Sequence, residues 1–315
     1  GDQGGSIRIP AALCGIVGLK PTYGRVPYSG AASVDSSLDH VGPMARKTRD
    51  VARMLAVLAG EDPTDPRSDG RLPLQDWVAA CDRPAHGLRV GVVEEGFVPE
   101  RADQDVAACV HQALTRLGGL GADVQNLSVP SHATSVQTWL PVILYGTLAG
   151  MWADGAGPGL TRDAMASMAK HLKGWPQRAD ELSDILRVIL LAGECARRRL
   201  GFEPYLRAHS LGRDLADAYD RALTDVDVLA MPTVPSVAAR LPGPNASTKE
   251  RWAAAVATTG NTAAFNLTGH PAITVNCGFL DGLPVGLMFI ARKGDEASLF
   301  RAASAVESVT EDRRP

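Results

Sequence analysis

The first ten residues contain the arrangement best suited to chemistry, with Gly4 and Gly5 directly before Ser6. Glycine lets the backbone approach a ligand closely and adopt dihedral angles that other residues avoid. Successive N–H groups in such a turn can converge on an anion, and a helix beginning near Pro10 would add its positive end. Beside a serine hydroxyl, these N–H groups could stabilise the oxyanion of an acyl-transfer reaction. Spacing alone favours a plain surface turn, so the chemical interpretation depends on further evidence.

Known phosphate-binding motifs do not account for this glycine pattern. The chain has no G-x-G-x-x-G after a strand, and the segment 15–22 departs from a phosphate-binding loop at Leu19 and Pro21. No G-x-S-x-G element surrounds Ser6, which argues against the sharp nucleophile turn of the α/β-hydrolases.

The composition excludes several classes of protein. The chain has 315 residues, 45% of them hydrophobic and 21% charged, with a net charge of −3, so no strong field would attract nucleic acid or an anionic membrane. No apolar run reaches the roughly 18–20 residues of a membrane span, and no signal sequence is evident. The 5 cysteines and 7 histidines are scattered. We therefore expect a cytoplasmic protein with reduced core thiols, no metal site and no cofactor.

The hydrophobic patterns predict one α/β domain over residues 1–315. Residues 1–45 suggest loops, a short helix and turns, and Thr48 would cap a helix that ends at Gly60. A strand at 88–93, a helix at 105–117 and a strand at 122–129 would form a parallel β-α-β unit. The remaining expected elements are helices within 139–200, strands at 226–230, 272–276 and 285–291, a turn at 281–282 and a helix at 296–309.

Several segments of the chain closely resemble the amidase signature family, and in detail the bacterial acylamide amidases of the nitrile-degrading type. The similarity begins with Asp2-Gln3-Gly4-Gly5-Ser6-Ile7-Arg8-Ile9-Pro10-Ala11. The other matching segments are 14–27, 37–46, 227–233, 266–272 and 282–286.

The resemblance implies a mixed β-sheet surrounded by helices and a Ser–cis-Ser–Lys triad that hydrolyses small amides to an acid and ammonia. By this resemblance Ser6 is the nucleophile. The backbone N–H groups of Gln3, Gly4, Gly5 and Ser6 would form the oxyanion hole, while Asp2 and Arg8 would hold the loop in shape.

The family's bridging serine and lysine have no counterpart in this chain, because they precede the nucleophile by more than the five residues before Ser6. We therefore expect the C-terminal two-thirds of a longer domain, with its N-terminal part absent and negligible turnover by this chain alone. Lys20, His40 and His270 are each expected to have structural roles, with His270 bonded to the backbone of a tight turn.

Other interpretations stay open at this point. The chain could be a non-catalytic protein that binds a carboxylate or an amide, or the amidase subunit of a tRNA-dependent amidotransferase. A homodimer is possible. The aromatic residues within 139–175, Trp139 among them, could line a substrate pocket or form plain core.

Overall fold

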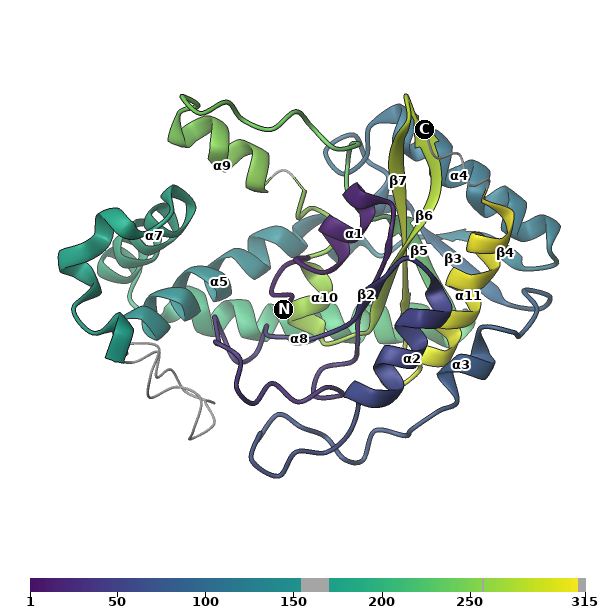
Figure 1. Cartoon of the computed structure of the whole chain (residues 1–315), viewed down its shortest axis with the longest axis horizontal. Helices are drawn as coiled ribbons and strands as arrows, with labels where there is room; N and C mark the ends of the chain where they lie inside the picture. Colours follow the sequence, from purple (N-terminus) through teal and green to yellow (C-terminus); the bar gives the residue numbers. More distant parts are fainter. Residues whose placement is uncertain (154–169, 257, 311–315) are drawn as a thin grey trace.

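The computed structural model describes residues 1–153, 170–256 and 258–310, and Figure 1 shows how their helices surround a central sheet. Seven strands form this sheet in the order β2-β1-β6-β7-β5-β3-β4. Their bounds are β1 Val17–Lys20, β2 Met44–Ala45, β3 Arg89–Val93, β4 Asp123–Leu127, β5 Val228–Pro232, β6 Ala272–Leu280 and β7 Leu283–Ala291.

The sheet is mixed, as expected. Strand β3 runs parallel to β4, with Arg89 opposite Asp123, and parallel to β5 on its other side. The other neighbouring pairs are antiparallel. The β3–α4–β4 unit confirms the predicted β-α-β pattern, and the β6–β7 hairpin turns at Asp281 and Gly282, which both have positive φ.

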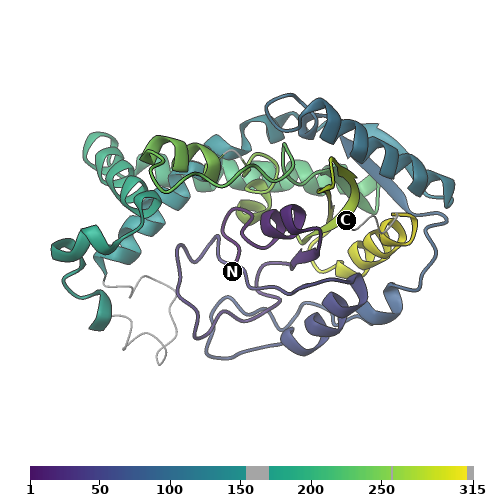
Figure 2. The same cartoon turned by 45° about the horizontal axis from the view of Figure 1, so that its top comes forward.

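Helices cover both faces of the sheet. The described α-helices are α1 Arg8–Cys14, α2 Thr48–Leu58, α3 Trp77–Ala80, α4 Gln104–Gly119, α5 Ser135–Trp152, α7 Asp184–Leu200, α8 Glu203–Asp225, α9 Thr248–Val256, α10 Ala264–Thr268 and α11 Glu296–Val309. Helices α5, α7 and α9 extend to the side of the molecule away from α11 (Figures 1 and 2). No helix in the part of the chain that the structure describes is long and apolar enough to cross a membrane.

The side chains of β5 point alternately to the two faces of the sheet, and a hydrophobic core lies on each face. Val228 packs in the cluster that α4 and α11 share with one face of the sheet. Leu229, the next residue, packs in a second cluster with Tyr219 of α8 and Phe265 of α10. Successive side chains of a strand point to opposite faces, so a strand buried on both sides must be apolar throughout, as all five residues of β5 are.

The sequence-based expectations missed several local features. Residues 17–20 form strand β1 within the segment expected to be loops, and α8 was not anticipated. Thr48 is the first residue of α2 rather than its cap, because the Glu307 carboxylate of α11 accepts the Thr48 N–H at 2.9 Å and replaces a local cap. Three cysteines are buried as expected, but Cys14 and Cys195 are exposed.

Candidate active site

The glycine-serine segment is held at its start by a short backbone bridge. The Asp2 N–H donates to the carbonyl of His40 at 2.9 Å, and the His40 N–H donates to the carbonyl of Asp2 at 3.1 Å. Helix α1 begins at Arg8, two residues after Ser6. The segment is therefore fixed between a neighbouring loop at one end and a helix on the sheet at the other.

The Asp2 carboxylate organises the turn from inside. Its two oxygens accept the backbone N–H groups of Gly5 at 2.8 Å and Ile7 at 3.1 Å. The Arg8 guanidinium donates to the same carboxylate from Nε at 3.1 Å and Nη2 at 3.0 Å. Both side chains are fully buried. Loop support by Asp2 and Arg8 stays a prediction, and these are the contacts through which the two residues would provide it.

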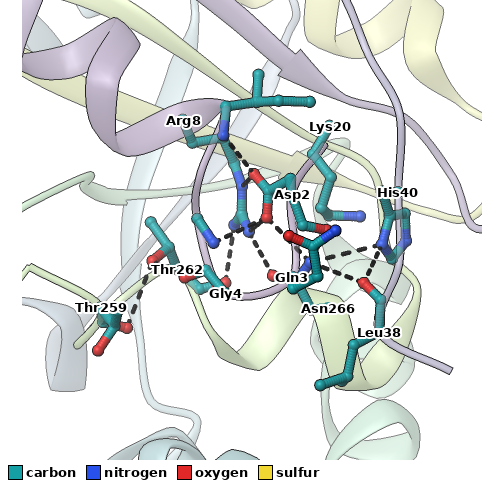
Figure 3. A network of polar contacts seen from close by, with 12 residues as sticks. Asp2, Gln3, Gly4, Arg8, Lys20, Leu38, His40, Thr259, Thr262 and Asn266 are labelled. Atoms are coloured by element: carbon teal, nitrogen blue, oxygen red, sulfur yellow. Dashed lines mark hydrogen bonds and ion pairs between the residues drawn. The ribbon is translucent and has the colours of Figure 1, made fainter. Parts of the chain in front are cut away.

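Arg8 also connects the turn to a segment more than 250 residues away (Figure 3). It donates to the carbonyl of Thr262 at 2.8 Å and to Oδ1 of Asn266 at 2.7 Å. The Asn266 amide in turn donates to the carbonyls of Asp2 at 2.7 Å and Leu38 at 3.1 Å. Burial by itself would raise the pKa of the Asp2 carboxyl, but the charge and hydrogen bonds of Arg8 outweigh it and hold that pKa below its ordinary value.

Two carbonyl groups of the turn face into the protein. Trp139 Nε1 donates to the carbonyl of Gln3 at 2.7 Å, and the Thr262 hydroxyl donates to the carbonyl of Gly4 at 2.6 Å. Sequence reasoning assigned no role to Thr262 or Asn266. Asn266 lies in one of the matching segments, which was the only available signal; Thr262 had none.

The N–H groups of the turn divide into two sets. The Gly5 N–H is donated to Asp2, which corrects the expectation that it would face an oxyanion. Among the described residues, the N–H groups of Gln3, Gly4 and Ser6 donate no hydrogen bond within the protein. Gly5 instead allows the turn to form, because its φ of 136° is one that residues with a side chain rarely adopt.

Gly5→Ala should therefore disrupt the turn. A methyl group there would overlap the Thr262 hydroxyl and lie 2.5 Å from Ile9 Cδ1, in addition to the backbone strain. We expect a loss of about 2–3 kcal/mol in the free energy of unfolding, measured by denaturant titration. Gly119→Ala is the matched control, because its added methyl meets no atom within 4 Å. Equal unfolding curves for the two variants would contradict this role of Gly5.

Ser6 lies exposed beside this turn, at the rim of a groove of about 530 Å³. Helices α1, α5 and α7 supply most of the wall. The apolar lining residues are Ile9, Pro10, Val34, Trp139, Ile143, Ile185, Leu186 and Ile189. Of the aromatic residues considered within 139–175, only Trp139 lines this groove. The arrangement places the Ser6 hydroxyl, and N–H groups that have no partner in the described part of the chain, next to an apolar surface.

The other candidate side chains are engaged elsewhere. Lys20 is buried with Nζ donating to the carbonyl of Pro21 at 3.1 Å, and burial lowers its pKa well below the ordinary value. His40 bonds the carbonyl of Leu38 through Nδ1 at 2.8 Å. The expectation for His270 was wrong in its partner, since it bonds the side chains of Thr268 and Asp220. Among the described residues, no lysine or histidine side chain is hydrogen-bonded to Ser6.

The described residues contain no group of three or more His, Cys, Asp or Glu side chains that could hold a metal ion.

Comparison with known proteins finds similarity along almost the whole chain. The family model for amidases matches residues 1–300. An enantioselective amidase of Rhodococcus rhodochrous is 37% identical over 98% of this chain and 60% of its own length. The A subunit of the glutamyl-tRNA(Gln) amidotransferase of Thioalkalivibrio sulfidiphilus is also 37% identical, over 99% of this chain and 63% of its own length. The chain thus spans about 60% of the length of these relatives.

Solved structures agree with the fold. The corresponding amidotransferase subunit of Thermotoga maritima superposes with a TM-score of 0.78 at 27% identity, over 99% of this chain and 62% of that one. A bacterial aryl acylamidase of the amidase signature family superposes with a TM-score of 0.77 at 23% identity, over 97% and 60% of the two chains. At that identity the second likeness supports the fold alone.

Proposed function

Because the chain belongs to the amidase family, we propose that it carries the nucleophile and the acyl-binding groove of an enzyme that hydrolyses carboxylic amides. The observation that carries this proposal is the exposed Ser6 beside three backbone N–H groups, on a turn held by the buried Asp2–Arg8 pair. Groups held in advance by the fold stabilise developing charge without reorganising during the reaction.

In the proposed mechanism, the Ser6 oxygen attacks the amide carbonyl carbon, and the carbonyl oxygen becomes an oxyanion. The N–H groups of Gln3, Gly4 and Ser6 donate to that oxyanion. Collapse of the intermediate breaks the C–N bond, and the proton lost by Ser6 leaves with ammonia or an amine. Water then attacks the acyl-enzyme, releases the acid and restores the Ser6 hydroxyl. By the family resemblance, the proton is relayed by a bridging serine and a lysine that precede this chain.

The groove favours amides with an apolar acyl group. Its walls are aliphatic side chains and the Trp139 ring, and no Lys, Arg, Asp or Glu is among the described residues that line it. An apolar acyl group buried there gains about 25 cal/mol for each Å² removed from water. We expect aromatic and branched aliphatic amides to react faster than acetamide.

Trapping the acyl-enzyme tests this proposal. With benzamide and hydroxylamine, hydroxylamine should compete with water for the acyl-enzyme, so benzohydroxamate forms beside benzoate and ammonia. The measurement is made on this chain and on a form extended at its N-terminus by a segment that supplies the bridging serine and the lysine implied by the family resemblance. The extended form should react far faster, because an unactivated serine is a poor nucleophile at neutral pH.

The outcomes separate the candidate functions. Binding of benzamide without ammonia release by either form would favour a non-catalytic amide-binding protein. Ammonia release from glutamine alone, and only with partner subunits present, would favour a role within an amidotransferase. The equal 37% identity to the amidase and to the amidotransferase relative supports keeping this second candidate. Equal rates from the short and extended forms would contradict the assignment of the proton relay to the preceding segment.

A further inference from the structure

A second pocket, of about 200 Å³, lies beside α5 and takes no part in the proposed reaction. It is formed by the loop 33–36, by α5 and by the start of α8, and we call it the Asp35 pocket. Val34 lines both this pocket and the Ser6 groove, but the α5 residues differ: Tyr145 and Gly146 face the Asp35 pocket, whereas Ile143 and Thr147 face the groove.

The Asp35 carboxylate is the charged group of this pocket, and Asp35 is only 7% exposed. It accepts hydrogen bonds from the Ser37 N–H at 2.9 Å, the Ser37 hydroxyl at 2.5 Å and the Tyr205 hydroxyl at 3.0 Å. Among the described residues, no Lys, Arg or His forms an ion pair with it. A buried carboxylate without a counter-charge is costly, so this site favours a cation.

Aromatic rings form the wall around the carboxylate. The ring centroid of Tyr145 lies 5.9 Å from that of Phe202 and 6.0 Å from that of Tyr205. Aromatic faces attract cations, and organic ammonium ions are often bound by several such rings. Burial and the neighbouring Asp35 charge raise the pKa of the Tyr205 hydroxyl, which therefore stays protonated as a donor to that carboxylate.

Gly146 of α5 keeps the Asp35 carboxylate close to the helix. A side-chain carbon at Gly146 would overlap the Asp35 carboxylate, so any larger residue would displace it from the pocket wall. The pocket is smaller than the roughly 300–1,000 Å³ typical of drug-sized ligands. A single carboxylate among aromatic rings is also a poor site for Ca²⁺ or Mg²⁺, which need about six oxygen ligands.

We propose that the Asp35 pocket binds a small organic ammonium ion, with the cationic head paired to Asp35 and its alkyl groups against Tyr145, Tyr205 and Phe202. The carboxylate supplies the charge, the rings supply both apolar contact and cation–π attraction, and the volume limits the ligand to a few heavy atoms. This site does not depend on the amide chemistry of Ser6.

Calorimetric titration of the 315-residue chain with choline tests the proposal, and 3,3-dimethylbutan-1-ol serves as the uncharged analogue of nearly the same shape. Choline should bind at least about tenfold more tightly than the alcohol. Asp35→Asn should remove this preference. Phe202→Leu should weaken choline binding about three- to fivefold, because it removes one cation–π contact.

Control variants test whether the changes in choline binding are specific to the Asp35 pocket. Phe202 is 60% exposed, so the leucine variant is expected to fold even if Asp35→Asn does not. Asp217→Asn, on the exposed surface of α8, and Ser6→Ala should both bind choline as the unchanged chain does. Equal affinity for choline and the alcohol, or choline binding that Phe202→Leu leaves unaltered, would overturn the proposal.

Discussion

Ser6→Ala should lower kcat/KM for amide hydrolysis by roughly 10³–10⁵-fold, because it removes the oxygen that forms the acyl-enzyme. The loss should appear in kcat, while benzamide binding in the apolar groove changes little, since the substituted hydroxyl lies at the rim of the groove. The measurement is steady-state ammonia release by the extended form, together with labelling by a serine-directed fluorophosphonate.

Ser308→Ala is the matched control, because Ser308 is exposed on α11 at a distance from the groove-lining residues. It should keep both the activity and the label. A Ser6→Ala variant that retains activity, or that still takes up the label in proportion to its turnover, would show that another residue is the nucleophile.

Arg8→Ala should have the largest effect on stability. It leaves the fully buried Asp2 carboxylate without the Arg8 charge and removes further hydrogen bonds, among them those to the Thr262 carbonyl and to Asn266. Removing one partner of a buried ion pair costs about 3–5 kcal/mol. We expect Arg8→Ala to lower the free energy of unfolding by this amount. Denaturant titration measures this loss, and the fluorophosphonate reaction at Ser6 should fall in parallel because the turn loses its support.

Matched variants separate charge from geometry. Arg8→Lys keeps the charge but has no planar guanidinium to bond Asp2, Thr262 and Asn266 together. Its free energy of unfolding should therefore lie between those of Arg8→Ala and the unchanged chain. Arg53→Ala, which breaks an exposed pair with Asp50, should leave stability nearly unchanged. If Arg8→Ala were no more destabilising than Arg53→Ala, the buried pair would not be what holds the turn.

The sequence by itself determined the features that depend on local pattern. Apolar runs and a helical periodicity predicted the β3–α4–β4 unit and the final helix, and Asp281-Gly282 predicted the β6–β7 turn. These predictions succeeded because neighbouring residues decide such structures. The Gly4-Gly5-Ser6 motif and the segments that resemble a known family similarly indicated where the chemistry would lie.

Tertiary structure alone decided how the turn is used. Thr262 and Asn266 are separated from Arg8 by more than 250 residues, so no local pattern shows that both accept hydrogen bonds from its guanidinium. The direction of each N–H group follows from these contacts. Asp2 accepts the Gly5 N–H, and Trp139 and Thr262 hold two carbonyls inward. The N–H groups of Gln3, Gly4 and Ser6 are left without a partner among the residues that the structure describes. A buried polar group must find a partner, and only the folded chain decides which partner it finds.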